Sequence, residues 1–178
     1  MSHRGVSSSG VVPEVVKIFV TVGTELPFDR LVVAVDEWAA RNGCADEVYA
    51  QIGESDVVPR HIGWVRFIEK PEFDRIFDQA EVIVSHAGMG TILSALDRQR
   101  RLLVMPRRAS LGEHRNDHQL ATTNRLVALD QVQVATDTDD LVRHLDDLAT
   151  VSSGMQIGHY AEESLIAAIR SRIYASRL

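Results

Sequence analysis

The sequence has a single cysteine, no long apolar run and no excess of positive charge. Because Cys44 has no second cysteine to pair with, the disulfide framework of small secreted proteins is excluded. No stretch approaches the ~20 apolar residues that a membrane-spanning helix needs, and residues 1–10 lack the apolar core of a signal peptide. The net charge of −6 disfavours binding to nucleic-acid phosphates. We therefore expect a cytoplasmic protein that does not bind nucleic acid.

What remains is the composition of one ordinary globular domain. The chain has 178 residues, of which 45% are hydrophobic and 25% charged, and this length allows a single domain with a sizeable core. We expect a disordered N-terminus over residues 1–14 and one domain, ending in a helix, over residues 15–178. A local basic patch stays open, since five arginines lie close in sequence: Arg98, Arg100, Arg101, Arg107 and Arg108.

Short apolar runs alternate with longer amphipathic stretches along the chain. Six runs rich in β-branched residues are expected strands: 16–22, 48–52, 65–68, 82–85, 102–105 and 132–135. Helices are expected between and after them, over residues 29–41, 71–79, 91–98, 113–126, 138–148 and 158–176. This alternation predicts an α/β fold, in which a Rossmann-like parallel sheet has right-handed crossovers and helices on both faces.

Two glycine-containing loops are candidate ligand sites, because parallel α/β sheets bind ligands beyond the carboxyl ends of their strands. The loop after the first strand contains Gly23 and Thr24, where a glycine allows close approach to a ligand or simply a tight turn. The fourth expected strand leads into Ser85-His86-Ala87-Gly88-Met89-Gly90-Thr91. Glycines and a threonine that open a helix are typical of a phosphate site, since the first amides of a helix have no intrahelical acceptor.

The second loop matches neither the Rossmann dinucleotide pattern nor a P-loop. No lysine follows its glycines, which argues against ATP hydrolysis. His86 either donates a hydrogen bond to a bound phosphate or packs within the loop.

A third polar loop, residues 112–119, follows the fifth expected strand. Glu113, Asp117 and Gln119 are candidates for hydrogen bonds to sugar hydroxyls, and the solvated start of a helix is the alternative. His114 and His118 lie four residues apart, which raises the question of a metal site. The glutamate does not lie between the histidines as in the zinc motif, so we expect no metal.

Read in order, these residues resemble glycosyltransferase family 28, in its C-terminal nucleotide-sugar-binding domain. The likeness covers roughly residues 17–129, with residues 85–96 similar to the diphosphate-binding motif and residues 113–119 similar to the sugar-reading motif. It is strongest to short, single-domain members: the small catalytic subunit of the dolichol-linked N-acetylglucosaminyltransferase and bacterial exopolysaccharide subunits of the PssE type. The resemblance implies one half of a GT-B glycosyltransferase.

The resemblance also implies a role for each loop. The diphosphate would be held by Gly88, Met89, Gly90 and Thr91, with His86 beside them. The donor sugar would be bound by Glu113, Asp117, His118 and Gln119. Gly23 and Thr24 would face the cleft. One position departs from the family pattern. Many relatives carry a ribose-binding glutamate eight residues after His86, where this chain has Ser94, which is too short and uncharged for that bidentate contact.

The implied reaction is an inverting transfer from a UDP-sugar to a polyprenyl-diphosphate-linked acceptor in exopolysaccharide synthesis, without a cofactor. The resemblance further implies a membrane-bound partner subunit that binds the lipid-linked acceptor and holds this chain at the inner face of the membrane. His86 is a candidate general base, and a residue of the partner subunit is the favoured alternative.

Several alternatives remain open at this point. The chain could be a non-catalytic module that binds UDP-sugars, or an epimerase-like protein. Arg107 and Arg108 precede the sugar-reading loop, so either they read an acidic sugar such as glucuronate or they are surface charges. The apolar stripe Leu165, Ile169 and Ile173 either packs on the sheet, docks onto the partner or supports self-association of the isolated chain.

Overall fold

The computed structural model of the chain describes residues 12–115, 119, 123 and 132–152. These residues form a parallel sheet with the strand order β3-β2-β1-β4-β5-β6. Its strands are β1 (Ile18–Thr21), β2 (Val48–Gln51), β3 (Gly63–Val65), β4 (Val82–His86), β5 (Arg101–Met105) and β6 (Val132–Val134). The helices are α1 (Asp29–Arg41), α2 (Lys70–Gln79), α3 (Met89–Asp97) and α5 (Thr138–Ser152), with short 3₁₀ turns η1 (Ala45–Glu47) and η2 (Ala109–Leu111). The predicted α/β fold is confirmed.

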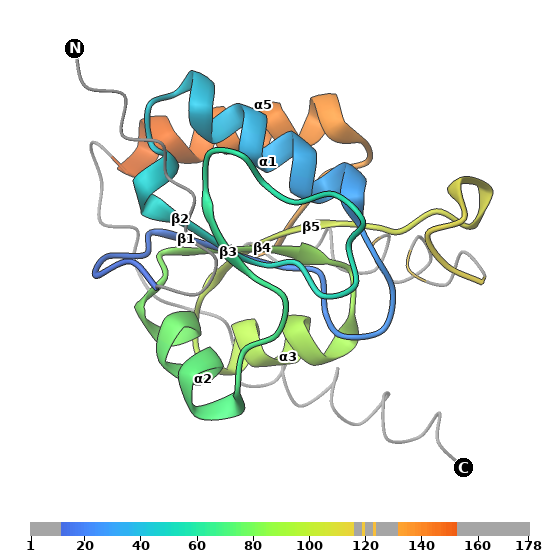
Figure 1. Cartoon of the computed structure of the whole chain (residues 1–178), viewed down its shortest axis with the longest axis horizontal. Coiled ribbons are helices and arrows are strands. Elements are labelled where there is room, and N and C mark those ends of the chain that lie inside the picture. Colours follow the sequence, from blue (N-terminus) through green and yellow to red (C-terminus); the bar gives the residue numbers. More distant parts are fainter. Residues whose placement is uncertain (1–11, 116–118, 120–122, 124–131, 153–178) are drawn as a thin grey trace.

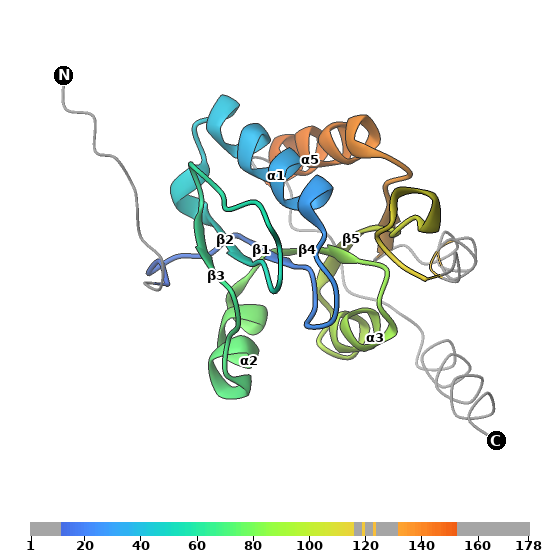
Figure 2. The same cartoon turned by 45° about the vertical axis from the view of Figure 1, so that its right-hand side comes forward.

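Helices cover both faces of the sheet. α1 and α5 lie on one face, and α2 and α3 lie on the other (Figures 1 and 2). Successive strand residues point to opposite faces, so Val20 and Val48 pack in the α1/α5 layer whereas Phe19 and Tyr49 pack in the α2/α3 layer. Strands covered on both faces carry nearly continuous apolar runs, which is why the sequence pattern located most of them.

Helix α1 has the bounds that its sequence predicts. Leu31, Val35 and Trp38 follow helical spacing and are buried, and each contributes about 1.5–3 kcal/mol of hydrophobic stabilisation. Asp29 in the first turn and Arg41 in the last turn have the charges that the helix dipole favours. The Trp38 indole Nε1 donates a hydrogen bond of 2.8 Å to an Asp146 carboxylate oxygen, which ties α1 to α5.

Helix α1 also fixes the loop between β2 and β3. The Asp36 side chain is buried, and its carboxylate oxygens accept the backbone N–H groups of Arg60, His61 and Ile62 at 2.9–3.0 Å. Three donors satisfy the carboxylate, so the cost of burying it is offset. The loop is therefore fastened to the helix just before β3 begins.

The prediction of a strand over residues 65–68 is wrong, because β3 spans Gly63–Val65. Gly63 pairs with Tyr49, and a Cβ on Gly63 would lie only 3.0 Å from the Tyr49 ring. A glycine is needed at the point where that ring crosses the edge strand, and glycine has low strand propensity. Phe67, which is part of the predicted strand, lies outside β3 and is 47% exposed.

The prediction that a helix begins at Glu113 is also wrong. Residues 113–115 are not helical, whereas Gln119 and Thr123 are. Gly112 ends η2 in the left-handed region, at φ 71°, and turns the chain there. The Glu113 carboxylate then accepts hydrogen bonds from Arg30 of α1 and from the Arg108 amide.

Several predictions fall outside the described residues. They are the disorder of residues 1–11, the sites at Asp117 and His118, and the apolar stripe of the helix over residues 158–176. The boundary after residue 14 and the single-domain span stay predictions.

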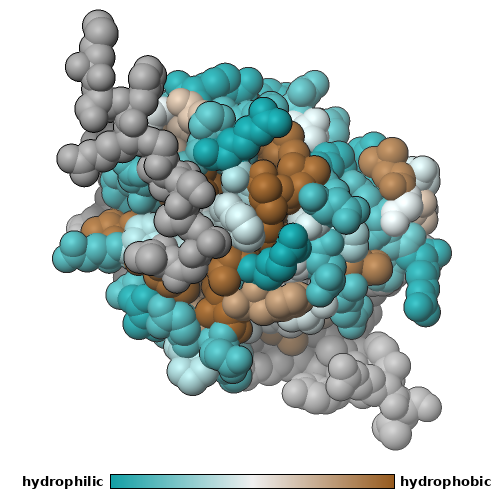
Figure 3. All heavy atoms as spheres, viewed as in Figure 1, coloured by the Kyte–Doolittle hydropathy of each residue, from teal (hydrophilic) through white to brown (hydrophobic). Residues whose placement is uncertain are grey.

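The visible surface is largely hydrophilic with separate apolar areas (Figure 3). The exposed large apolar side chains include Val57 and Val58 of the β2–β3 loop. Within the described residues, no helix is both long enough and apolar enough to cross a bilayer.

Candidate functional site

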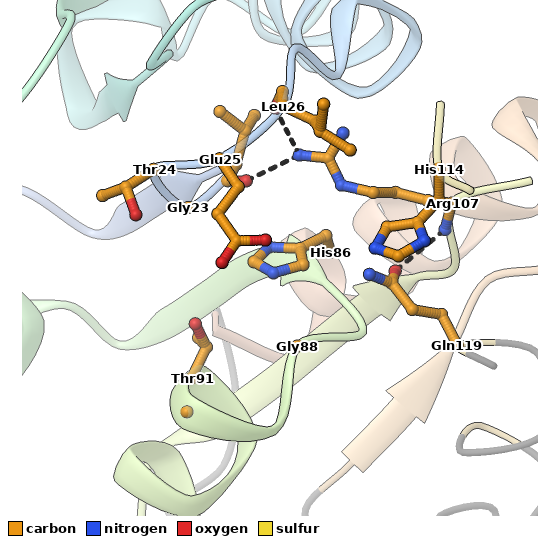
Figure 4. A pocket seen from close by; sticks show the side chains of 12 residues that line it. Gly23, Thr24, Glu25, Leu26, His86, Gly88, Thr91, Arg107, His114 and Gln119 are labelled. Carbon is orange, nitrogen blue, oxygen red and sulfur yellow. Dashed lines mark hydrogen bonds between the residues drawn. The ribbon is translucent and has the colours of Figure 1, made fainter. Parts of the chain in front are cut away.

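A cavity of about 290 Å³ opens at the carboxyl ends of β1, β4 and β5 (Figure 4). Three segments line it: residues 22–26 after β1, the connection from β4 into α3, and the polar segment after β5. The strand order reverses between β1 and β4, which are neighbours in the sheet although far apart in sequence. Open α/β sheets bind their ligands at this switch point.

The structure brings most of the predicted site residues together. Those that line the cavity are Gly23, Thr24, His86, Gly88, Gly90, Thr91 and Gln119. The Met89 side chain instead packs against the α2/α3 core, and Glu113 does not line the cavity. Ser94 lies one turn further along α3 and is likewise not among the lining residues.

The N-terminus of α3 forms one wall of this cavity. Gly88 is the N-cap and provides no side-chain cap, and the Ile92 N–H bonds back to the Gly88 carbonyl at 3.1 Å. The amides of Met89, Gly90 and Thr91 therefore precede the first intrahelical bond and lie at the positive end of the helix dipole. A Cβ on Gly90 would meet no heavy atom within 4 Å. This open space above the amides suits an anionic oxygen.

The His86 ring fills the space that two glycines leave. A Cβ on Gly88 would lie 2.1 Å from His86 Nε2, and one on Gly23 would lie 2.8 Å from His86 Cε1. Gly23 also has a φ of 79°, which favours glycine by itself. The imidazole thus joins the loop after β1 to the loop after β4, and both loops need a glycine to accommodate it.

His86 is neutral at physiological pH. Burial lowers the pKa of His86 to about 4, and the nearby Arg107 charge acts in the same direction. A hydrogen bond with the Thr21 backbone opposes this shift without outweighing it. In the ligand-free chain His86 therefore carries no positive charge at neutral pH, and a pKa near 4 is low for a general base.

Arg107 is a buried structural cation. Its side chain is 2% exposed, and its guanidinium donates to the carbonyl oxygens of Val22 at 2.8 Å, Leu26 at 2.6 Å and Pro27. It also lies 4.7 Å from the centroid of the Phe28 ring. Burial lowers the pKa of Arg107 to about 10, so it keeps its charge at neutral pH. Neither surface charge nor a free sugar-reading arginine describes this residue.

At least three of the five arginines that lie close in sequence have partners within the chain, and Arg107 is one of them. Arg98 pairs with Asp74 at 2.7 Å and with Asp78 at 3.1 Å. Arg108 donates to the Thr136 carbonyl oxygen. Each of these side chains therefore has a partner within the chain.

Glu113 stabilises the loop rather than facing the cavity. Its two carboxylate oxygens accept hydrogen bonds from the Arg30 guanidinium at 2.8 and 2.9 Å, and the Arg108 amide donates to one of them at 2.9 Å. Burial by itself would raise the pKa of Glu113, but the ion pair with Arg30 and the Arg108 amide hold it below its usual value. These contacts leave little of the carboxylate for a sugar hydroxyl.

Gln119 is buried and lines the cavity from the segment after β5. Its side-chain carbonyl oxygen accepts the backbone N–H of Arg107 at 3.0 Å, and its amide nitrogen lies on the cavity side (Figure 4). The amide group is thus held in one orientation with a donor available to a ligand.

Sequence reasoning predicted no ligand contact for four of the lining residues: Val22, Glu25, Leu26 and His114. Glu25 provides the only carboxylate among the described lining residues. For Glu25 and Leu26, the available signal was their position directly after Gly23 and Thr24. Within the described part of the chain, no three His, Cys, Asp or Glu side chains are grouped so that they could hold a metal ion.

Similar solved structures share this fold. A crystal structure of the glycotransferase of kitacinnamycin matches 84% of this chain and 39% of its own length, with a TM-score of 0.55 and 20% identity. An NMR structure of ALG13 matches 77% of this chain and 87% of its own length, with a TM-score of 0.55 and 18% identity. A crystal structure of MurG of Acinetobacter baumannii matches 79% of this chain and 42% of its own length, with a TM-score of 0.55 and 16% identity. The chain thus spans about two fifths of the first and third of these structures.

The family is established by sequence. No curated protein matches the chain. The family model described as the glycosyltransferase family 28 C-terminal domain matches residues 17–163, which is most of the chain. Together with the cavity at the switch point of a Rossmann-like half of GT-B, this match means that the chain belongs to the glycosyltransferase family 28 C-terminal domain family.

Proposed function

We propose that this chain is the donor-binding catalytic subunit of a two-component glycosyltransferase. It moves a sugar from a UDP-sugar to a polyprenyl-diphosphate-linked acceptor in exopolysaccharide synthesis. The observation that carries the proposal is the N-terminus of α3 in the wall of the cavity. No side chain caps its first amides, and no protein atom fills the space beside Gly90.

The chemistry of this wall supports a diphosphate leaving group. When a UDP-sugar reacts, negative charge grows on the UDP oxygens. The amides of Gly90 and Thr91 and the dipole of α3 stabilise that charge without a metal ion. Because His86 is neutral, the site relies on the amides, the Thr91 hydroxyl and the buried Arg107 charge for its attraction to anions.

The sugar lies between the polar segment after β5 and the loop after β1 in this proposal. The Gln119 amide nitrogen donates to a sugar hydroxyl, and the Arg107 N–H holds the Gln119 carbonyl in place. Asp117 and His118 are assigned to the sugar by the family motif alone. The proton of the acceptor hydroxyl is taken by a residue of the partner subunit, because the low pKa of His86 argues against this histidine as the base.

The chain covers 39% and 42% of two larger glycosyltransferases with this fold, so it corresponds to one part of such an enzyme. The other part of the proposal is an acceptor-binding half, which the family resemblance assigns to a partner subunit. In this proposal a membrane-bound subunit provides that half, and it holds the chain at the inner face of the membrane.

Calorimetric titration with UDP in excess chelator tests the donor site. We expect saturable binding without divalent metal, and ADP is the control for recognition of the base. Complete loss of UDP binding in chelator would contradict a metal-free site. If UDP binds but sugar transfer never occurs with the partner subunit present, the chain is a binding module rather than half of an enzyme.

A further inference from the structure

The cavity has few charged side chains. Apart from the histidines, the described lining residues include two ionisable groups, Arg107 and Glu25. These two groups differ in how much of their bonding capacity remains for a ligand.

Three arginines in or near the cavity, Arg30, Arg107 and Arg108, are not available to an anionic sugar. The Arg107 guanidinium donates to backbone carbonyls of residues 22, 26 and 27. Arg30 is bound to both carboxylate oxygens of Glu113, and Arg108 lies outside the lining and donates to the Thr136 carbonyl. Among the described lining residues, a sugar carboxylate would therefore find no arginine free to form the paired hydrogen bonds that such groups prefer.

Glu25 is available to a ligand. It is exposed on the loop after β1, and its carboxylate is directed into the cavity on the side of His86 (Figure 4). Among the described residues, Glu25 forms no side-chain hydrogen bond or ion pair, and its charge acts on Arg107 only through space. A carboxylate accepts hydrogen bonds at two oxygens, and neighbouring hydroxyl groups of a sugar are matching donors.

We infer that Glu25 binds hydroxyl groups of the donor sugar and excludes donors whose sugar carries a carboxylate. This inference rests on the proposed function, because it places a UDP-sugar in the same cavity. It assigns the site to neutral hexosyl donors and decides against the acidic sugar that Arg107 and Arg108 suggested from sequence.

The size of the discrimination follows from like-charge repulsion. Two negative charges roughly 6 Å apart in a partly hydrated cleft change affinity by about tenfold. The diphosphate also carries negative charge, so removing the Glu25 charge should raise the affinity for UDP as well, by a smaller factor than the affinity for an acidic donor. The ratio of affinities between two donors is therefore the relevant measurement.

UDP-glucose and UDP-glucuronate provide the matched probes, since they differ in whether C6 is an alcohol or a carboxylate. Their dissociation constants are measured by calorimetry for the wild-type chain, for Glu25→Gln and for Glu37→Gln. Glu37 is exposed on α1 and does not line this cavity, so its substitution removes the same charge elsewhere. We expect the wild type and Glu37→Gln to favour UDP-glucose by about tenfold or more.

In Glu25→Gln we expect UDP-glucuronate to bind about tenfold more tightly and UDP-glucose to bind no better than in the wild type, so that the preference disappears. A wild type that binds UDP-glucuronate equally well or better overturns the inference, and so does a preference that survives in Glu25→Gln. In both cases the proposed function stands, because UDP-sugars still bind. If neither UDP nor a UDP-sugar binds the wild type, the proposed function fails and the inference fails with it.

Discussion

The two glycines that open α3 should respond differently to the same substitution. Gly88→Ala places a Cβ 2.1 Å from His86 Nε2, and ordinary contact at 3.4 Å requires the ring to retreat by about 1.3 Å. Gly23 also packs against the His86 ring, since a Cβ on Gly23 would lie only 2.8 Å from His86 Cε1. Gly90→Ala adds a Cβ that meets no atom within 4 Å. The first change disturbs the protein, whereas the second meets no protein atom.

The expected magnitudes follow from this packing. Overfilling a packed site costs about 1–3 kcal/mol, and for a chain of this size 1 kcal/mol corresponds to about 2–4 °C in Tm. We expect Gly88→Ala to lower Tm by roughly 2–12 °C and to weaken UDP as the loop shifts. Gly90→Ala should leave Tm unchanged or slightly higher, because alanine favours a helix over glycine, yet it should weaken UDP binding. Fluorescence of the two tryptophans reports unfolding, and calorimetry reports binding.

A double-mutant cycle tests the proposed cause. If the His86 ring is what the new Cβ strikes, Gly88→Ala should cost clearly less stability when His86 is already alanine. An equal cost in both backgrounds would refute the steric reasoning. If neither Gly90→Ala nor the bulkier Gly90→Val alters the affinity for UDP, the α3 amides are not part of the donor site.

Three further outcomes are expected. Gln119→Ala should weaken a UDP-sugar more than UDP, by a further 0.5–1.5 kcal/mol or about 2- to 13-fold for one lost hydrogen bond, and equal losses in calorimetry would indicate a structural role alone. The pKa of His86 is about 4 in the folded chain and about 6.5 when unfolded, so the unfolded state takes up the proton first as pH falls. Urea titrations should therefore show that the free energy of unfolding decreases from about pH 6.5 to 4, and that it decreases less steeply in His86→Asn. Identical slopes in the two proteins would contradict the neutral histidine. Asp36→Ala should destabilise the chain by about 2–5 kcal/mol and speed hydrogen exchange at the amides of Arg60, His61 and Ile62, whereas Glu37→Ala should do neither.

The sequence pattern predicts the layers and the edge of the sheet that carries the site. Helix α1 matches its predicted bounds because Leu31, Val35 and Trp38 repeat at helical spacing and no other interaction overrides them. Gly88, Gly90 and Thr91 were identifiable because a strand, a glycine-rich turn and a helix follow one another directly. Strand β3 was misplaced because Gly63 is selected by the Tyr49 ring across the sheet, and such a contact leaves no periodic signal.

The electrostatic part of the site was harder to predict. A buried arginine and a surface arginine look alike in sequence, and the partners of Arg107 are carbonyl groups, which every residue has. Glu113 looked like a free sugar-binding carboxylate because its partner, Arg30, lies 83 positions away in sequence. Glu25 gave no signal of its own, since a single acidic residue in a loop is usually solvated.

The two kinds of arginine contact imply different evolutionary histories. Arg30 and Glu113 recognise each other through side chains, so related sequences can replace both together and the two positions should covary. Arg107 binds backbone oxygens of residues 22, 26 and 27, which no substitution can alter. A change at position 107 consequently has no single compensating mutation. Among relatives that keep the same path for the loop after β1, this position should be nearly invariant and should covary with no other.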